Sequence, residues 1–294
     1  MSGVMMEILN YEGGEPGPVL VVLGGVHGNE PGGSAAIRDI ESLLETGALK
    51  LNAGELILIP EVNRKALQEN VRYIDRDLNR RLGEIETPSC HEDYVANEIC
   101  PVLRQADVLL DLHGYKSGTE PFVFLGEGNP AEKAFARSLG PSHFCWNFQA
   151  ATDTATGNKS HSIGTTEYTR AHNGYGVTLE CGHYQDVKAT ARIGKEAILN
   201  ALSHLGMANV SRETYQEQNI KHHFVKLTQS VIKKRAGELT RKWAHLDKLA
   251  RNTVIARYED GQEISAQEES YILLPDAEAE IGTNWFYLGI EQEP

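Results

Sequence analysis

The chain has 294 residues, of which 40% are hydrophobic and 23% charged, and this composition excludes a disordered protein. Its 41 acidic and 28 basic residues give a net charge of −13, which argues against nucleic acid or an anionic membrane as a partner. No apolar run reaches the ~20 residues of a membrane span. The first residues lack a signal peptide's basic and apolar regions. We therefore expect a cytoplasmic protein with four free cysteines.

The first two thirds of the chain alternate short apolar runs with helical patterns. A helix is predicted at 31–44, a second at 93–103 that is broken or ended at Pro101, and a third at 190–205. Strands are predicted at 18–23, 56–60, 108–112, 122–125 and 177–179. Such alternation predicts an α/β sandwich with a largely parallel or mixed sheet.

The pattern changes after about residue 210. Short apolar pieces at 223–227, 254–256, 271–274 and 285–288 are separated by turn signals. We predict a catalytic domain over residues 1–210 and a small β-rich domain over residues 211–294.

The first candidate site follows the first predicted strand. His27 and Glu30 lie three residues apart in a glycine-rich loop, and both side chains are zinc ligands in proteins. Reactive groups of open α/β sheets collect at the carboxyl ends of strands. The alternative is an ordinary turn with an exposed histidine and a glutamate at a helix start.

Two further strand ends carry polar side chains. His113 ends the run 108–112 and could be a third ligand, with Asp111 orienting it. Glu180 ends the run 177–179 and could act as a general base beside a metal. Surface residues at strand ends remain the alternative for both.

A polar stretch between these segments contains Asn79 and Arg80. A guanidinium binds a carboxylate through two parallel hydrogen bonds, and a neighbouring amide adds directional donors. Residues 61–81 carry six basic and four acidic side chains, so this stretch is positive in an acidic protein. A solvated charged loop is the alternative.

Four motifs occur in order along the chain: HGNE, DLNR, DLHG and LECG, at residues 27–30, 77–80, 111–114 and 179–182. Together they resemble the succinylglutamate desuccinylase/aspartoacylase branch of the zinc carboxypeptidase superfamily. The resemblance covers nearly the whole chain, including the C-terminal tail. It implies a carboxypeptidase-like α/β/α sandwich with a mixed central sheet and a small C-terminal β-rich domain.

The resemblance also implies roles for individual residues. One zinc ion per chain would be held by His27, Glu30 and His113, and Glu180 would be the catalytic base. Asn79 and Arg80 would hold the substrate's α-carboxylate. Arg170 would grip an acidic acyl or side-chain end.

The chain departs from the family at two points. The family has Asn-Pro-Arg after the second strand, and its arginine polarises the scissile carbonyl, whereas this chain has Asn63, Arg64 and Lys65. We assign the role to Arg64 rather than Lys65, because only a guanidinium offers a forked donor. Neither Tyr271 nor Tyr287 is a clear match for the family's C-terminal tyrosine.

We thus expect a zinc-dependent hydrolase that cleaves the amide bond of a small anionic N-acyl amino acid. A zinc carboxypeptidase acting on short peptides and a catalytically silent metal-binding protein are the alternatives. A homo-oligomer is possible. Residues 211–257 carry a net charge of +7 and residues 258–294 a net charge of −10, and we expect these two sets to pair rather than to bind nucleic acid.

Overall fold

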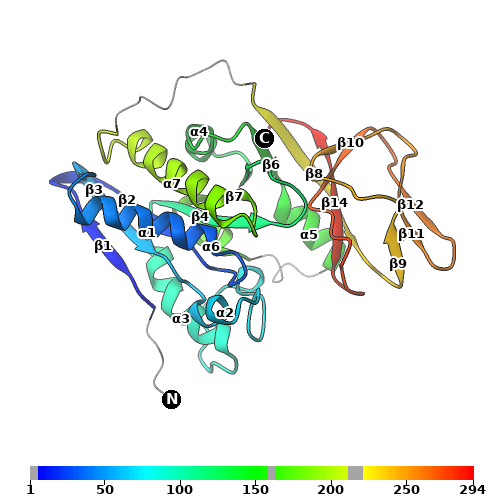
Figure 1. The fold of residues 1–294 in the computed structure, drawn as a ribbon, viewed down its shortest axis with the longest axis horizontal. Coiled ribbons are helices and arrows are strands. Elements are labelled where there is room, and N and C mark those ends of the chain that lie inside the picture. Colours follow the sequence, from blue (N-terminus) through cyan, green and yellow to red (C-terminus); the bar gives the residue numbers. More distant parts are fainter. Residues whose placement is uncertain (1–5, 158–162, 211–220) are drawn as a thin grey trace.

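The computed structural model describes residues 6–157, 163–210 and 221–294. The structure contains an 11-stranded sheet. Figure 1 shows helices packed on both faces of the part of this sheet that contains β2, β4 and β7. The helices are α1 (Gly32–Glu45), α2 (Arg64–Glu69), α3 (His91–Arg104), α4 (Pro130–Ser138), α5 (Phe148–Thr156), α6 (Thr165–Ala171) and α7 (Val187–His204), with a 3-10 turn at Leu78–Arg80. The first strands are β1 (Leu9–Glu12), β2 (Glu15–Leu23), β3 (Ala53–Ile59), β4 (Val108–Tyr115), β5 (Phe122–Leu125), β6 (His143–Trp146) and β7 (Tyr175–His183). The later strands are β8 (His223–Ile232), β9 (Gly237–Leu239), β10 (Asp247–Leu249), β11 (Val254–Tyr258), β12 (Glu263–Ser265), β13 (Ser270–Leu273) and β14 (Asn284–Glu291).

The large sheet is mixed and has the strand order β1-β3-β2-β4-β7-β5-β6-β8-β14-β13-β10. Strands β3, β2, β4 and β7 run parallel to one another, whereas β5 runs antiparallel to β7. The parallel strands therefore direct their carboxyl ends to one edge of the sheet.

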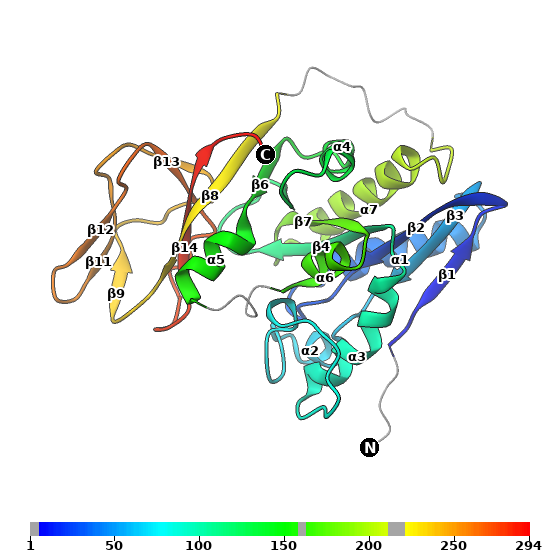
Figure 2. The same ribbon diagram turned by 180° about the vertical axis from the view of Figure 1, so that it is seen from behind.

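Strand β2 shows why both faces of the sheet are covered. Leu20 and Val22 pack into a core with residues of α1 and α7, whereas Val21 and Leu23 pack with residues of α3. Side chains alternate across a strand, so an uninterrupted apolar run serves two cores. The two opposite views show α1 and α7 on one face and α3 and α6 on the other (Figures 1 and 2). The fold is an α/β/α sandwich with additional C-terminal β strands, as predicted.

The C-terminal strands continue the large sheet, because β8 pairs in parallel with β6. Strands β9, β11 and β12 form a separate three-stranded sheet whose core includes Trp243 and Trp285. The expected pairing of charge sets is present in part, since Arg235 contacts Asp260 and Arg257 contacts Glu263. The domain division at residue 210 stays a prediction, and residues 211–220, where the second domain would begin, lie outside the described residues.

Most predicted elements are present, but one helix differs. We expected the second helix to break or end at Pro101, yet α3 continues through it to Arg104. Pro101 stands in the last turn, where only a few residues follow the lost backbone donor. The four cysteines are free, as expected. No helix in the described part of the chain is long and apolar enough to cross a membrane. Residues 1–5, which form most of the segment without signal-peptide features, lie outside that part.

Candidate metal centre and catalytic pocket

The candidate site lies where the carboxyl ends of β2, β4 and β7 meet. His27 and Glu30 stand in the turn between β2 and α1, His113 is near the end of β4, and Glu180 is near the end of β7. His113 and Glu180 are direct partners in the register of the two parallel strands. The sheet topology thus brings together residues that are up to 153 positions apart in the sequence.

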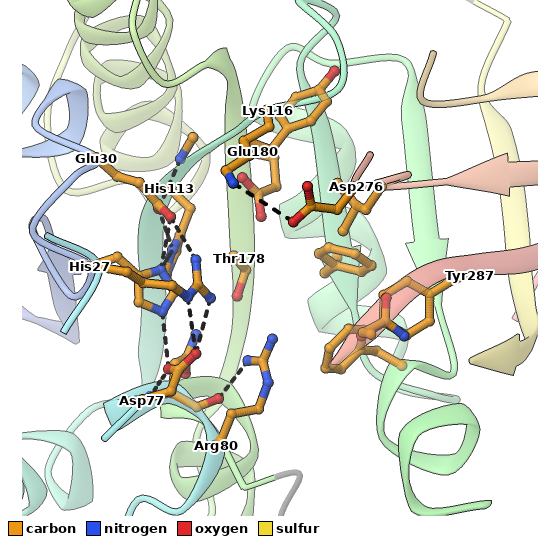
Figure 3. A pocket seen from close by; sticks show the side chains of 18 of the residues that line it. His27, Glu30, Asp77, Arg80, His113, Lys116, Thr178, Glu180, Asp276 and Tyr287 are labelled. Carbon is orange, nitrogen blue, oxygen red and sulfur yellow. Dashed lines mark hydrogen bonds and ion pairs between the residues drawn. The ribbon is translucent and has the colours of Figure 1, made fainter. Parts of the chain in front are cut away.

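Three predicted metal ligands converge on one point. Nδ1 of His27 lies 3.0 Å from Oε1 of Glu30, and Nδ1 of His113 lies 2.9 Å from Oε2 of Glu30. The two Nδ1 atoms are 3.1 Å apart. All three side chains are buried. Figure 3 shows them facing one another at one side of the pocket.

The opposite nitrogen of each imidazole faces a carboxylate. Nε2 of His27 lies 3.2 Å from Oδ1 of Asp77, and Nε2 of His113 lies 2.9 Å from Oδ2 of Asp111, the orienting residue suggested by the sequence. A carboxylate close to Nε2 favours a proton on that nitrogen, which in a neutral imidazole leaves the Nδ1 lone pair free to bind a metal. The carboxylates beside the Nε2 atoms therefore favour Nδ1 of each histidine as the atom that would bind a metal.

The pKa values of the cluster follow from burial and charge. Burial alone would raise the pKa of Glu30, but the two neighbouring imidazoles outweigh it and lower that pKa well below its usual value. Burial would lower the pKa of His113, but the nearby carboxylates, first Asp111, raise it.

The donor set fits zinc. Two imidazole nitrogens and one carboxylate oxygen are ordinary zinc ligands, and tetrahedral bonds of about 2.0–2.1 Å place ligand atoms about 3.3 Å apart. The observed separations of 2.9–3.1 Å are close to that value. A second group, Asp75, Cys90 and Glu92, also has its ligand atoms close together. There, however, Glu92 already accepts backbone hydrogen bonds from residues 74–76 with both oxygens.

Glu180 is the unpaired carboxylate of the site. Its Oε2 is buried and has no hydrogen-bond partner among the described residues. Burial raises its pKa to about 7, and the charge of Glu30 adds to that increase. A carboxyl group with a pKa near neutrality can both accept and return a proton.

Arg72 is a pocket residue that the sequence interpretation missed. Its Nη1 donates to Glu30 at 3.1 Å, and its Nε donates to Asp77 at 3.1 Å. Arg64 is placed elsewhere: its side chain is about half exposed and pairs with Glu61 at 3.3 Å. Among the described residues that line the pocket, Arg72 appears and Arg64 does not.

The local fold explains this difference. Arg64 begins the short helix α2, which ends at Asn70 in a left-handed conformation (φ 52°). That residue reverses the chain and returns the following segment to the metal ligands. The sequence offered one clue to Arg72, namely its position eight residues before Arg80 in the same polar stretch.

Asn79 and Arg80 lie on the 3-10 turn and line the pocket. The side-chain oxygen of Asn79 accepts a hydrogen bond from the backbone of Thr165 at 2.9 Å. The Arg80 guanidinium lies 5.4 Å from the ring centre of Phe148 and donates to the carbonyl of Asn79. Arg170 also lines the pocket but is paired with Glu132 and Glu167.

The pocket has a volume of about 790 Å³ and is shared between the two parts of the chain. One wall holds the candidate ligands and Glu180, and the other comes from residues 274–287, which include the connection between β13 and β14 and the start of β14 (Figure 3). Tyr287 lines this second wall, whereas Tyr271 does not appear among the described lining residues. Lys116 spans the gap to Asp276 at 3.7 Å.

An α/β/α sandwich with a His–Glu–His cluster beside a buried carboxylate is the arrangement of a hydrolase. Residues 16–205 match the family model of the succinylglutamate desuccinylase/aspartoacylase catalytic domain. The chain belongs to this family, whose members are hydrolases that in general depend on zinc. A comparison with curated protein sequences finds no match.

Solved structures share the fold over nearly the whole chain. A succinylglutamate desuccinylase/aspartoacylase from Rhodobacter sphaeroides has a TM-score of 0.77 at 19% identity, covering 98% of this chain and 90% of that one. The product-bound ectoine utilization protein EutE (DoeB) from Ruegeria pomeroyi has a TM-score of 0.75 at 18% identity, covering 98% and 89%. Succinylglutamate desuccinylase from Vibrio cholerae has a TM-score of 0.75 at 15% identity, covering 97% and 85%.

Proposed function

We propose that this protein is a zinc-dependent amidohydrolase that cleaves a small N-acyl amino acid into a carboxylate and a free amino acid. The observation that carries the proposal is the convergence of His27, Glu30 and His113 beside the unpaired carboxylate of Glu180. His27, Glu30 and His113 would hold one zinc ion. When bound, zinc lowers the pKa of water and polarises a carbonyl oxygen.

Glu180 moves the proton in this proposal. Its carboxylate takes a proton from the attacking water and returns it to the nitrogen of the leaving amine. Burial in the pocket favours the protonated form of this carboxyl group, which is the form that returns the proton. This function requires no covalent intermediate with the protein.

Arg72 stabilises negative charge on the carbonyl oxygen. Its guanidinium is fixed by Glu30 and Asp77, so it needs no rearrangement when that charge develops. We assign to Arg72 the role that the sequence suggested for Arg64. Its contacts with Glu30 and Asp77 use three of its five N–H groups, one each from Nε, Nη1 and Nη2. Two N–H groups therefore remain for the substrate.

Arg80 and Asn79 bind the carboxylate of the amino acid. The second wall of the pocket supports a small substrate over a peptide, because Asp276 and Tyr287 stand opposite the candidate metal ligands and limit the space for a long chain. Oε2 of Glu180 has no hydrogen-bond partner among the described residues, which supports a working enzyme over a silent metal-binding protein.

Metal analysis and an amine-release assay test this function. We expect about one zinc per chain in the native protein, loss of that zinc in His27→Ala, and release of free amine from at least one member of a panel of N-acetyl, N-formyl and N-succinyl amino acids. A protein with no affinity for zinc would contradict the proposal. The control is Arg192→Ala, which lies on α7, is well exposed and should retain zinc and activity.

A further inference from the structure

Arg170 was expected to bind an acidic end of the substrate, but most of its donors already bind other groups of the protein. Its Nε and Nη2 atoms donate to the two oxygens of Glu132 at 2.9 and 3.0 Å. Nη2 also donates to the carbonyl of Gly176 at 2.7 Å, and Nη1 donates to Glu167 at 3.1 Å. Four of the five guanidinium hydrogens are thus committed.

Burial of Glu132 makes it costly to move Arg170 away from these contacts. The residue lies on α4, is 1% exposed, and also accepts hydrogen bonds from the backbone of Gly126 and Gly176. In the described part of the chain, Arg170 is its one cationic partner within ion-pair distance. A substrate carboxylate that drew Arg170 away would leave a buried carboxylate without a counter-charge, which is costly. Together with Glu167, the three side chains carry one net negative charge.

Two other pocket cations are also neutralised by carboxylates. Arg72 pairs with Glu30 and Asp77, each at 3.1 Å. Lys116 lies 3.7 Å from Asp276 and 3.5 Å from Glu278, and Figure 3 shows the first of these contacts crossing the upper part of the pocket.

Arg80 differs from these three cations. Among the described residues, no carboxylate lies within ion-pair distance of its guanidinium. Its guanidinium donates a hydrogen bond to the carbonyl of Asn79 and lies against the ring of Phe148. The pocket wall also carries the exposed carboxylates of Glu127 and Glu280, neither of which has an ion-pair partner among the described residues.

We infer that the pocket accepts a substrate with a single carboxylate, bound at Arg80, whose acyl group and side chain are uncharged or positively charged. This inference rests on the proposed hydrolase function and narrows its substrate class. A second carboxylate at the Arg170 end would meet the net negative charge of the Glu132, Arg170 and Glu167 cluster. A neutral amide or an ammonium group meets no such penalty.

Matched substrates test the inference with the zinc-loaded protein. N-acetyl-L-glutamine and N-acetyl-L-glutamate differ in one neutral or charged group of the same size. We expect kcat/KM to be at least tenfold higher for the glutamine compound, with N-acetyl-L-lysine also preferred over the glutamate compound. Equal values, or a preference for the glutamate compound, would overturn the inference and leave the hydrolase function standing. Hydrolysis of none of the N-acyl amino acids would overturn both.

The acyl side is tested in the same way. With glutamine as the common amino acid, N-acetyl and N-butyryl compounds should be cleaved at least tenfold faster than the N-succinyl compound, which carries a second carboxylate. A preference for the succinyl compound would contradict the inference.

Two variants connect the selectivity to this cluster. Glu132→Gln and Glu167→Gln each remove one negative charge beside Arg170 and keep an oxygen acceptor. The ratio of kcat/KM for the glutamine and glutamate compounds should fall at least fivefold in each. Glu167 is only half-buried, so its variant serves if the buried Glu132 variant does not fold. Glu196→Gln, an exposed residue on α7, is the control and should keep the native ratio. An unchanged ratio in the variants near Arg170 would overturn the inference.

Discussion

Replacing Arg72 should separate two assignments of the carbonyl-polarising group. In Arg72→Gln, the pocket loses a guanidinium whose Nη1, Nη2 and Nε atoms each lie 3.1 Å from a carboxylate of Glu30 or Asp77. These contacts leave one hydrogen on each terminal nitrogen for the substrate oxygen. Loss of one fixed donor to a developing oxyanion costs about 100- to 1,000-fold in kcat, or about 2.7–4 kcal/mol.

Arg64→Gln is the matched control. The Arg64 side chain is 48% exposed and pairs with Glu61 at 3.3 Å on the protein surface. Such a pair contributes at most about 1 kcal/mol to stability and nothing to transition-state binding. We expect kcat and kcat/KM of this variant to stay within about twofold of the native values.

The assay is steady-state amine release with the zinc content of each protein measured in parallel. Because Arg72 also neutralises Glu30, rates must be compared per bound zinc. A parallel fall of kcat and kcat/KM in Arg72→Gln indicates a contact made in the transition state. A native kcat in Arg72→Gln, or a 100-fold loss of kcat in Arg64→Gln, would contradict the assignment of Arg72 as the group that polarises the carbonyl.

Two further predictions concern stability. Burial lowers the pKa of His245 to about 3, so the unfolded chain takes up a proton below pH 6.5 that the folded chain refuses, and stability falls as the pH falls from 6.5 toward 3. Urea unfolding should show that His245 lowers the free energy of unfolding by about 2 kcal/mol between pH 6.5 and 4.5. This loss should be absent in His245→Asn. The same pH dependence in that variant would contradict the assignment of the lowered pKa to His245. Arg170→Met leaves the buried Glu132 carboxylate without its cationic partner and should lower the free energy of unfolding by about 3–5 kcal/mol. The exposed Arg192→Ala should lower it by less than about 1 kcal/mol. Equal losses in the two variants would show that burial of the Arg170–Glu132 pair has no effect.

The central strands could be predicted from sequence because they are buried on both faces. The run 18–23 is apolar without interruption, and β2 serves two cores. The run 122–125 coincides with β5. Short helices such as α4 and α6 were not predicted, because they are only nine and seven residues long and several of their buried residues are polar, among them Glu132 and Thr165.

The candidate site could be predicted where residues follow strands. His113 and Glu180 end apolar runs, and parallel strands bring such ends together. The segment 63–82 was different, because its conformation depends on the reversal at Asn70 and on hydrogen bonds to distant residues. The sequence analysis therefore chose between Arg64 and Lys65 and did not consider Arg72.

The state of Arg170 could not be predicted for a related reason. Its partner Glu132 lies 38 residues earlier, on a helix that the sequence did not indicate. Charge counting along the chain detects neither the pair nor its burial. The substrate class that we infer rests on that pair rather than on the net charge of −13.

The most direct test of the account is amide hydrolysis by Glu180→Gln with its zinc content measured on the same sample. The account predicts about one zinc per chain, as in the native protein, and a loss of about 100- to 10,000-fold in kcat, because the base that moves the proton is absent. Native activity in this variant with zinc bound would contradict the proposed mechanism.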